Sequence, residues 1–439
     1  METHNQPFIS VGIDIGADFS LMAIALPTQE IIGRPYRILH SNLNSVQGAI
    51  DRIRTLETLH ALKAKVFMES TGIYHYPIYH RLKQEGLAVF ILNPIITHAN
   101  SNINVRGVHN DKFDAQKIAW LGLKPKLKTS IVPDDDVAAI KVLMREYHAM
   151  KKDCSQYICR LTAQLRQTFP QYLPLFSKVN GKTSLEILYR YTVPETILAT
   201  DDAELVGLIM QTSGKGRAMA EQKYKRLTLA AFEAASFGHS NEGNVYLIRH
   251  FVEMIRLIDA QTDRLLKQIY NSLECQPTSQ ITRQTQLLQS IPGVGYLSAV
   301  TLVCEIGNFN AFHHPKQLYS YFGLDPKVRQ SGNFKGTELK MSKRGSPFAR
   351  RCLYMLALQS VSLRKNGEPK NPVLREFYIE KCKSKAKMTS LGAVMHKVCN
   401  IIFAVLRDEQ PFRFITPNEH RIAYFNGTDS LAVCNYAHR

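Results

Sequence analysis

The first apolar run of the chain reads Phe8-Ile9-Ser10-Val11-Gly12-Ile13-Asp14-Ile15-Gly16. Its apolar and β-branched residues predict a buried β-strand, with one carboxylate, Asp14, near the end. Burying an unpaired carboxylate is costly, so an Asp in this position favours a functional role over a structural one. In open α/β sheets, the carboxyl end of a strand faces the crevice where ligands bind.

Three further acidic residues extend this pattern. Glu69 closes the run Ala64–Glu69, and Asp111 and Asp114 lie three apart at the start of a predicted helix, on one helical face. Carboxylate oxygens suit Mg²⁺ or Mn²⁺, and a pair of such ions can clamp the attacking and leaving oxygens of a phosphodiester. We therefore interpret Asp14, Glu69, Asp111 and Asp114 as candidate metal ligands for phosphoryl transfer. Taken alone, Asp111 is equally well explained as a helix N-cap.

Residues 8–125 alternate short β-type runs with amphipathic stretches, which predicts an α/β domain. Three early strands followed by strand–helix alternation is the order expected of a ribonuclease-H-like sheet. Fold analogy alone does not fix function. The predicted strands are Phe8–Ile15, Ser20–Leu26, Tyr36–Leu39, Lys65–Met68 and Leu87–Leu92, and the predicted helices are Val46–Leu62 and Pro77–Glu85.

Residues 126–284 are predicted to be helical. Apolar residues recur at spacings of three and four over Asp134–Gln167 and again over Leu247–Leu273, as in long amphipathic helices. Such a pair suggests an antiparallel coiled-coil arm or a dimer interface, and a helical layer within one monomer is the alternative. Between them, about 168–240 is interpreted as an inserted helical subdomain with no assigned chemistry.

Residues 285–412 are predicted to form a third, mainly helical unit, followed by a tail over 413–439. Leu287–Ala299 reads as a helix, a Pro-Gly-x-Gly turn and a second helix. This is the helix-hairpin-helix pattern, in which glycines let backbone N–H groups approach a phosphate. A plain helix–helix turn would also use glycine.

A basic segment follows that turn. Between residues 313 and 351, nine Lys or Arg stand against two acids. Ser331 is a candidate nucleophile there, because surrounding cations would stabilise charge on an attacked phosphate. Ser-Gly in a loop is more often only a turn, and Ser342 and Ser346 compete for the role. The predicted nucleic-acid-binding residues are Arg106, Lys112, Gly293, Gly295, Lys327, Arg329, Lys335, Lys340, Lys343, Arg344, Arg350 and Arg351.

Overall composition points to a polyanionic partner. The 439 residues include 55 Lys and Arg against 37 Asp and Glu, a formal net charge of +18. No apolar run is expected to span a membrane, so nucleic acid is favoured over a membrane surface. Eight scattered cysteines without a Cys-x-x-Cys pair, and an amino terminus unlike a signal peptide, predict a protein of the bacterial cytoplasm, associated with the nucleoid when it acts.

In combination, these motifs resemble the DEDD transposases, insertion-sequence recombinases described as bridge-RNA-guided, with the pilin-gene invertases as relatives. The resemblance covers about residues 8–125 and 285–412. It rests on Gly12-Ile13-Asp14, Glu69–Tyr74, Asn93-Pro94, Asp111–Ala115, Ile291–Gly295, Gly323-Leu324-x-Pro326, Ser331-Gly332, Arg350–Met355 and Met395-His396-Lys397, in that order.

The resemblance implies a specific mechanism. The four acids would be the metal-binding tetrad of a RuvC-like domain, and Ser331 would form a covalent 5′-phosphoserine link to DNA. The active site would be composite, built by two subunits of a dimer or tetramer, with a structured RNA pairing to donor and target DNA. One departure is notable: the family commonly has Lys-Thr before the third acid, whereas this chain has His109-Asn110, with Arg106 the nearest upstream cation.

Other functions remain open at this level. Gly12–Asp18 also resembles the first phosphate loop of sugar kinases and actin-like ATPases, but no later Gly-rich adenosine loop is found. A metal-dependent nuclease or junction resolvase would need the acids but not Ser331. A non-catalytic nucleic-acid scaffold would need only the basic third unit, and four intact acids argue against it.

Overall fold

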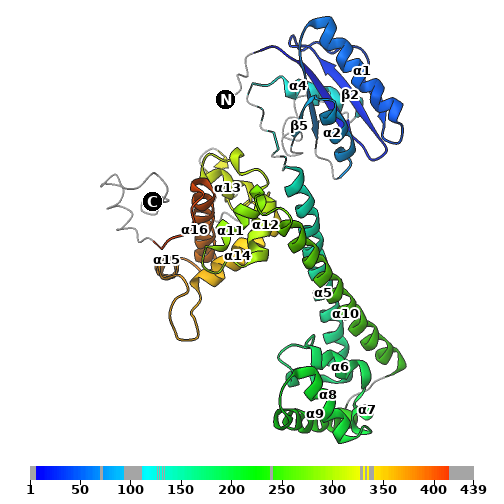
Figure 1. Ribbon diagram of the computed structural model, residues 1–439, viewed down its shortest axis with the longest axis vertical. Coiled ribbons are helices and arrows are strands. Elements are labelled where there is room, and N and C mark those ends of the chain that lie inside the picture. The colour runs from blue at the N-terminus through cyan, green and yellow to red at the C-terminus, as the bar shows by residue number, and fades with distance from the viewer. Residues whose placement is uncertain are drawn as a thin grey trace. The chain divides into compact units, whose positions relative to one another are not determined.

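The computed structural model describes residues 6–69, 73–92, 111–125, 134–237, 241–326 and 341–414, with 127, 129–130, 132, 330–331 and 334–335. For 111, 112, 237, 330–331 and 334–335 it describes the backbone only. The chain divides into two compact units, Met1–Val132 and Pro133–Arg439 (Figure 1).

The amino-terminal unit is built on a five-stranded mixed sheet with the order β3-β2-β1-β4-β5. Strand β1 pairs antiparallel with β2 and parallel with β4, and β4 pairs parallel with β5. All five predicted strands are present, with ends shifted by one residue at most. They are β1 (Ile9–Ile15), β2 (Phe19–Ala25), β3 (Tyr36–Leu39), β4 (Ala64–Glu69) and β5 (Ala88–Leu92); the helices are α1 (Leu43–His60), α2 (His75–Gln84) and α4 (Asp111–Gly122).

Helices cover both faces of this sheet. Odd-numbered residues of β1, such as Ile13, join the core formed with α1 and α2. Even-numbered residues face α4: the Ser10 hydroxyl donates to the Ala119 carbonyl at 2.6 Å. At Gly12, an added Cβ would lie 2.2 Å from the Ala119 nitrogen, so only glycine lets α4 approach β1 this closely. The predicted α/β domain is confirmed.

The second unit contains two long helices, α5 (Asp135–Thr168) and α10 (Glu242–Glu274), which pack antiparallel. The direction follows from two contacts: Asn244 donates to Gln164 at 2.9 Å, and Lys151 donates to Asp259 at 3.2 Å. Both predicted helices are present. A coiled-coil arm or a dimer interface stays a prediction, because packing within one chain also satisfies their apolar faces.

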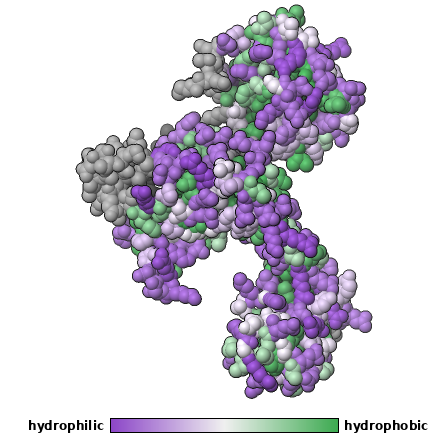
Figure 2. Space-filling view, viewed as in Figure 1, coloured by the Kyte–Doolittle hydropathy of each residue, from purple (hydrophilic) through white to green (hydrophobic). Residues whose placement is uncertain are grey.

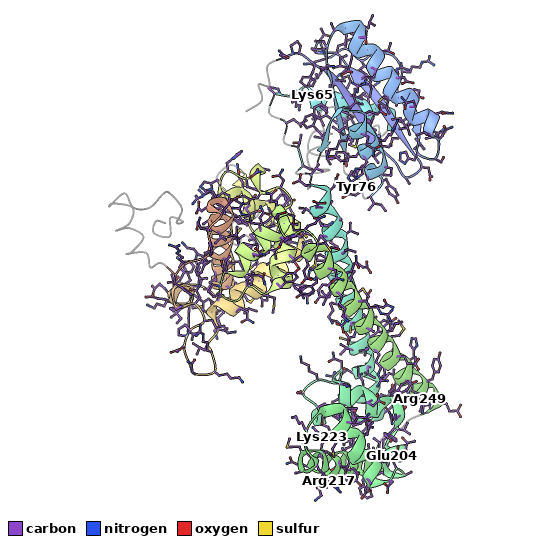
Figure 3. All side chains as sticks on the ribbon, in the orientation of Figure 1. Lys65, Tyr76, Glu204, Arg217, Lys223 and Arg249 are labelled. Atoms are coloured by element: carbon purple, nitrogen blue, oxygen red, sulfur yellow. The ribbon has the colours of Figure 1, made fainter. Side chains whose placement is uncertain are left out.

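Shorter helices with a shared apolar core lie between the two long ones. Figure 3 shows charged side chains on these helices and on α10. Arg249 of α10 donates to Thr192 at 2.9 Å, and the Lys223 ammonium lies 4.8 Å from the centre of the Phe176 ring. The elements are η2 (Pro170–Leu175), α6 (Lys182–Arg190), α7 (Pro194–Leu198), α8 (Asp202–Ser213) and α9 (Arg217–Phe237).

The rest of the second unit is mainly helical around α16 (Lys387–Asp408). Contrary to the expectation from sequence, α16 is long and apolar enough to cross a membrane, but 67% of its apolar window is buried, as in a core helix. The other elements are α11 (Gln280–Gln289), α12 (Tyr296–Ile306), η3 (Phe309–Ala311), α13 (Pro315–Tyr321), β6 (Gln330–Ser331), β7 (Phe334–Lys335), α14 (Pro347–Val361) and α15 (Pro372–Ser384).

Candidate active site

Asp14 and Glu69 are brought together by the pairing of β1 with β4. These strands run parallel, with Ile13 opposite Met68. One residue further along each strand, Asp14 and Glu69 are therefore lateral neighbours, with backbones about 5 Å apart. Both side chains are half-buried. Two carboxylates thus stand side by side at the carboxyl edge of the parallel strands.

The same strand geometry sets the face to which these carboxylates point. Phe67, opposite Gly12, would be 2.4 Å from a Cβ added at Gly122 of α4. Since side chains alternate along a strand, Asp14 and Glu69 lie on the same face as Gly12 and Phe67. That face is the one covered by α4.

Helix α4 runs in the opposite direction to β1. Ser10 meets Ala119, and Gly12 meets Ala115 as well as Ala119. Two residues of strand advance about 6.6 Å, and four residues of helix about 6 Å. Each two residues of β1 therefore match four residues of α4 in length. Two residues beyond Gly12, Asp14 lies beside the first turn of α4, which begins at Asp111 and contains Asp114.

The acids of α4 differ in what the structure describes. Asp111 is the first residue of the helix, as the sequence predicts, and its side chain lies outside the described atoms. Asp114 accepts a hydrogen bond from the Lys117 ammonium at 2.8 Å, with its side chain 35% exposed. Sequence reasoning missed Lys117, although its i+3 spacing from Asp114 is the signal for such an ion pair.

The donor types in this region fit a hard divalent cation, because all four predicted ligands offer carboxylate oxygens. Among the side chains that the structure describes, no group of three His, Cys, Asp or Glu is close enough to hold a metal ion. Asp111 falls outside that set, and Asp114 is held by Lys117. The described geometry therefore supplies a pair of neighbouring carboxylates rather than a closed ligand cage.

Ser331 lies in a short hairpin of the second unit. Strands β6 and β7 pair antiparallel, with Gln330 opposite Lys335 and Ser331 opposite Phe334. The pairing leaves two residues between the strands, Gly332 and Asn333, which lie outside the described residues. Ser331 is the last residue of β6, and only its backbone is described.

The chain segments on either side of this hairpin are held together. The Ser342 amide donates to the Asp325 carbonyl at 2.7 Å, and the Lys343 amide to the Gly323 carbonyl at 3.0 Å. Gly345 packs so closely that an added Cβ would lie 1.9 Å from the Tyr321 carbonyl oxygen. These two flanking segments therefore form a closed base for the hairpin.

The two serines that compete with Ser331 have structural roles. Ser342 is buried, and its hydroxyl donates to the Asp325 carboxylate at 2.7 Å. Ser346 is the N-cap of α14 and accepts from the Ala349 amide at 3.2 Å. Both hydroxyls help to shape the base of the hairpin.

The predicted nucleic-acid-binding cations differ in exposure. Lys343, Arg344 and Arg351 are exposed, whereas the half-buried Arg350 guanidinium donates to the carbonyls of Phe322 and Gly345. Burial lowers the pKa of Arg350. Arg350 thus has a structural role that sequence reasoning missed. Lys112 lies in α4 and Lys335 in β7 with backbone only, and outside the described residues are Arg106, Lys327, Arg329 and Lys340.

The predicted Pro-Gly-x-Gly turn joins α11 to α12. Gly293 has φ +91°, a conformation that favours glycine, and Gly295 is the N-cap of α12, with no side-chain cap. An added Cβ at Gly295 would meet nothing within 4 Å. The two predicted helices are present on either side of this turn, whereas a helix-hairpin-helix motif and its phosphate-binding role stay predictions.

Comparison with known families matches both units. A model described as Transposase matches residues 11–170, which include all four acids. A model described as Transposase IS116/IS110/IS902 family matches residues 285–378, which include Ser331. This chain belongs to the IS110 family of transposases.

Curated relatives agree with this assignment. The chain is 31% identical over 140 residues to the transposase for insertion sequence element IS1111A of Coxiella burnetii, covering 32% of this chain and 37% of that relative. It is 26% identical over 255 residues to the pilin gene-inverting protein of Moraxella bovis, covering 55% and 72%. An uncharacterized 43.6 kDa protein of insertion element IS110 from Streptomyces coelicolor is 22% identical, covering 64% and 66%.

Proposed function

We propose that this IS110-family chain is a DNA recombinase of an insertion sequence. It would cut and rejoin DNA with a divalent metal held by Asp14, Glu69, Asp111 and Asp114, and with Ser331 as nucleophile. The observation that carries the proposal is the strand register that sets Asp14 beside Glu69, facing the first turn of α4. Membership of a DEDD-type transposase family supports the use of a divalent metal.

The acids would act as oxygen ligands from two elements. Asp14 and Glu69 would bind from the sheet, and Asp111 and Asp114 from the first turn of α4. When bound, Mg²⁺ or Mn²⁺ would stabilise negative charge on the attacked phosphate and the leaving oxygen. The metal ion and the Lys117 ammonium would then compete for the Asp114 carboxylate, so Asp114 would either bind both or release Lys117.

Ser331 would carry the covalent step. Its hydroxyl oxygen would bond to a DNA phosphorus and lose its proton, while the bond from phosphorus to the 3′ oxygen breaks. The products are a free 3′-hydroxyl and a 5′-phosphoserine link. Attack by another 3′-hydroxyl on that link would rejoin DNA and restore the serine hydroxyl. One phosphodiester is exchanged for another, so no outside energy source is required.

Nucleic acid is the partner that the charge supports. Residues 285–439 hold 22 Lys and Arg against 10 Asp and Glu, so most of the net charge of +18 lies beyond the long helices. From the resemblance, we further propose a structured guide RNA that pairs with donor and target DNA. We also propose a homodimer or tetramer in which the acids of one subunit serve the Ser331 of another, acting on the nucleoid.

The test is to trap protein–DNA adducts in cells that carry the whole element. Wild type, Ser331→Ala and Asp14→Ala are compared on denaturing gels, with Ser155→Ala, an exposed serine of α5, as the matched control. Adducts in wild type and Ser155→Ala alone are the expected result. Adducts that persist in Ser331→Ala would move the nucleophile elsewhere. Asp14-dependent nicking without any adduct would instead indicate a metal-dependent nuclease or junction resolvase.

A further inference from the structure

A second basic surface lies in the carboxyl-terminal part of the chain, outside the segment around Ser331. It comprises residues 364–387: a projecting turn after α14, helix α15 and the link to α16. Figure 2 shows hydrophilic side chains over the projecting turn, which Figure 1 draws between α14 and α15. Eight Lys and Arg stand here against three Glu, and the cations are Arg364, Lys365, Lys370, Arg375, Lys381, Lys383, Lys385 and Lys387. We call this the α15 basic surface.

The α15 basic surface rests on an ordered frame. An isolated β-bridge joins Leu363 to Pro369, and the Lys370 amide donates to the Ser362 carbonyl at 3.1 Å. The Arg375 guanidinium donates to the Val361 carbonyl at the end of α14. Helix α15 packs on both α14 and α16. The cations are therefore presented in a defined arrangement rather than on a free tail.

Like charges gather on this frame. The ammonium groups of Lys381 and Lys397 lie 5.5 and 5.3 Å from the centre of the same Phe377 ring, which keeps them within about a Debye length of each other. Lys383, Lys385 and Lys387 follow at alternate positions, and all three are exposed. Exposed like charges this close together attract an external anion.

The nearby acids compensate little of this charge. Glu380 pairs with Lys383 at 2.5 Å, and Glu368 pairs with Arg364 at 3.9 Å. All four of these side chains are at least 60% exposed, and exposed ion pairs contribute little. Five net positive charges over 24 residues therefore remain for an external anion.

We propose that the α15 basic surface binds the phosphodiester backbone of a nucleic-acid duplex. The proposal rests on the proposed function only for the class of partner, because the bound DNA or the structured RNA of a recombinase would both present this backbone. Lysine ammonium groups are point charges that contact phosphates without reading bases, so binding would be independent of sequence. This surface would hold nucleic acid outside the Ser331 hairpin.

The test measures binding by the full-length chain. One variant carries Lys381→Gln, Lys383→Gln, Lys385→Gln and Lys387→Gln. The matched control removes the same charge from exposed lysines of α5 and of the region between α5 and α10, with Lys152→Gln, Lys178→Gln, Lys182→Gln and Lys225→Gln. Both sets are made in a Ser331→Ala background, so failure of the proposed covalent chemistry leaves the result unaffected. Circular dichroism and melting verify that each variant is folded.

Anisotropy titrations with duplex DNA and with duplex RNA are run across a salt series. Each lost phosphate contact reduces the magnitude of the slope of log affinity against log salt by about 0.9. Loss of four contacts should therefore reduce this magnitude by about 2–4 on whichever duplex the wild type binds more tightly. Affinity near physiological salt should fall at least about 10²-fold, and the control should keep both slope and affinity. Unchanged slopes on both duplexes, an equal loss in the control, or binding only to anionic phosphatidylserine vesicles would overturn the proposal.

Discussion

At the scale of single residues, Lys117 forms an ion pair with Asp114, one of the four predicted metal ligands. Its ammonium holds the Asp114 carboxylate at 2.8 Å and lies 4.8 Å from the centre of the Phe113 ring. A cation in that place competes with a metal for the same oxygen. Lys117 therefore either tunes metal affinity or only stabilises the first turns of α4.

We expect Lys117→Ala to raise the affinity of the chain for Mn²⁺ by about 3- to 10-fold, the range of a 1 kcal/mol ion pair. Isothermal titration calorimetry measures this directly. Lys63→Ala removes the same charge just before β4, at the opposite end of that strand from Glu69, and should leave the affinity unchanged. Equal or weaker Mn²⁺ binding by Lys117→Ala would remove Asp114 from the proposed ligand set.

Glu305 forms a buried ion pair between α12 and α5. The Arg145 guanidinium donates to both carboxylate oxygens, at 2.9 and 3.1 Å, and Lys141 lies 3.8 Å away. Burial would raise the pKa of Glu305, but the hydrogen bond from Arg145 and the charges of Lys141 and Arg145 hold it below 4.5. Burial lowers the pKa of Lys141. Arg145 is the closer partner of Glu305, because its two nitrogens lie within hydrogen-bond distance and the Lys141 ammonium does not.

A lowered carboxyl pKa contributes stability above 4.5, and this contribution is lost as pH falls through the folded value. We expect Glu305→Gln to destabilise the second unit by about 2–4 kcal/mol at neutral pH. As pH falls below 4.5, the difference in unfolding free energy between the variant and wild type should narrow, because the wild-type carboxyl becomes protonated. Urea midpoints recorded at a series of pH values test this, and a gap that stays constant would contradict it.

At the scale of elements, the two long helices differ in how they begin. Asn241 caps α10 with a full capping box, in which its side chain and that of Asn244 each accept from the other's backbone amide. Asp134, the N-cap of α5, makes no such side-chain hydrogen bond. Both helices thus begin at polar residues, but only α10 begins with a closed cap.

We expect Asn241→Ala to destabilise the second unit by about 1 kcal/mol, since the Asn244 backbone amide loses the side-chain oxygen that accepts its hydrogen bond. Asp134→Ala should cost less, because it removes only a charge near the helix dipole. Thermal unfolding ranks the two variants. Amide hydrogen exchange should show faster opening at the first turn of α10 in Asn241→Ala; an equal effect at both caps would argue against the capping box.

At the scale of the whole molecule, the chain consists of two compact units, Met1–Val132 and Pro133–Arg439, each with its own core. Unit boundaries of this kind predict separate unfolding events rather than one cooperative transition. Gly12 offers a probe for one unit, because any side chain there collides with the backbone of α4. Asn241 offers a probe for the other.

Calorimetry of the full chain should therefore resolve two transitions. Gly12→Ala should lower the transition temperature of the amino-terminal unit alone, because overpacking reduces the unfolding free energy of that unit by about 1–3 kcal/mol. Asn241→Ala should lower only the transition of the second unit. Gly207→Ala, at an exposed position of α8 with no atom within 4 Å, should be neutral or stabilising. A single transition shifted by both Gly12→Ala and Asn241→Ala would show that the units unfold together.

The local elements could be predicted from the sequence. Short apolar, β-type runs identified all five strands of the first unit, and spacings of three and four identified α5 and α10, because buried positions select apolar residues at the spacing of each element. The four acids and the glycines of the α11–α12 turn were also visible, because each stands out against its local pattern. Ends were less certain: α1 begins at Leu43, three residues before the predicted Val46.

Which of these residues contact one another depends on the tertiary structure. The parallel register of β1 with β4 makes neighbours of Asp14 and Glu69, and the close approach of α4 at Gly12 sets the first turn of that helix beside them. Likewise, Arg145 and Glu305 are 160 residues apart in sequence, and Arg350 binds carbonyls instead of standing exposed. Local sequence sets the conformation of an element, whereas contacts between distant elements depend on the packing of complete surfaces, which no short pattern contains.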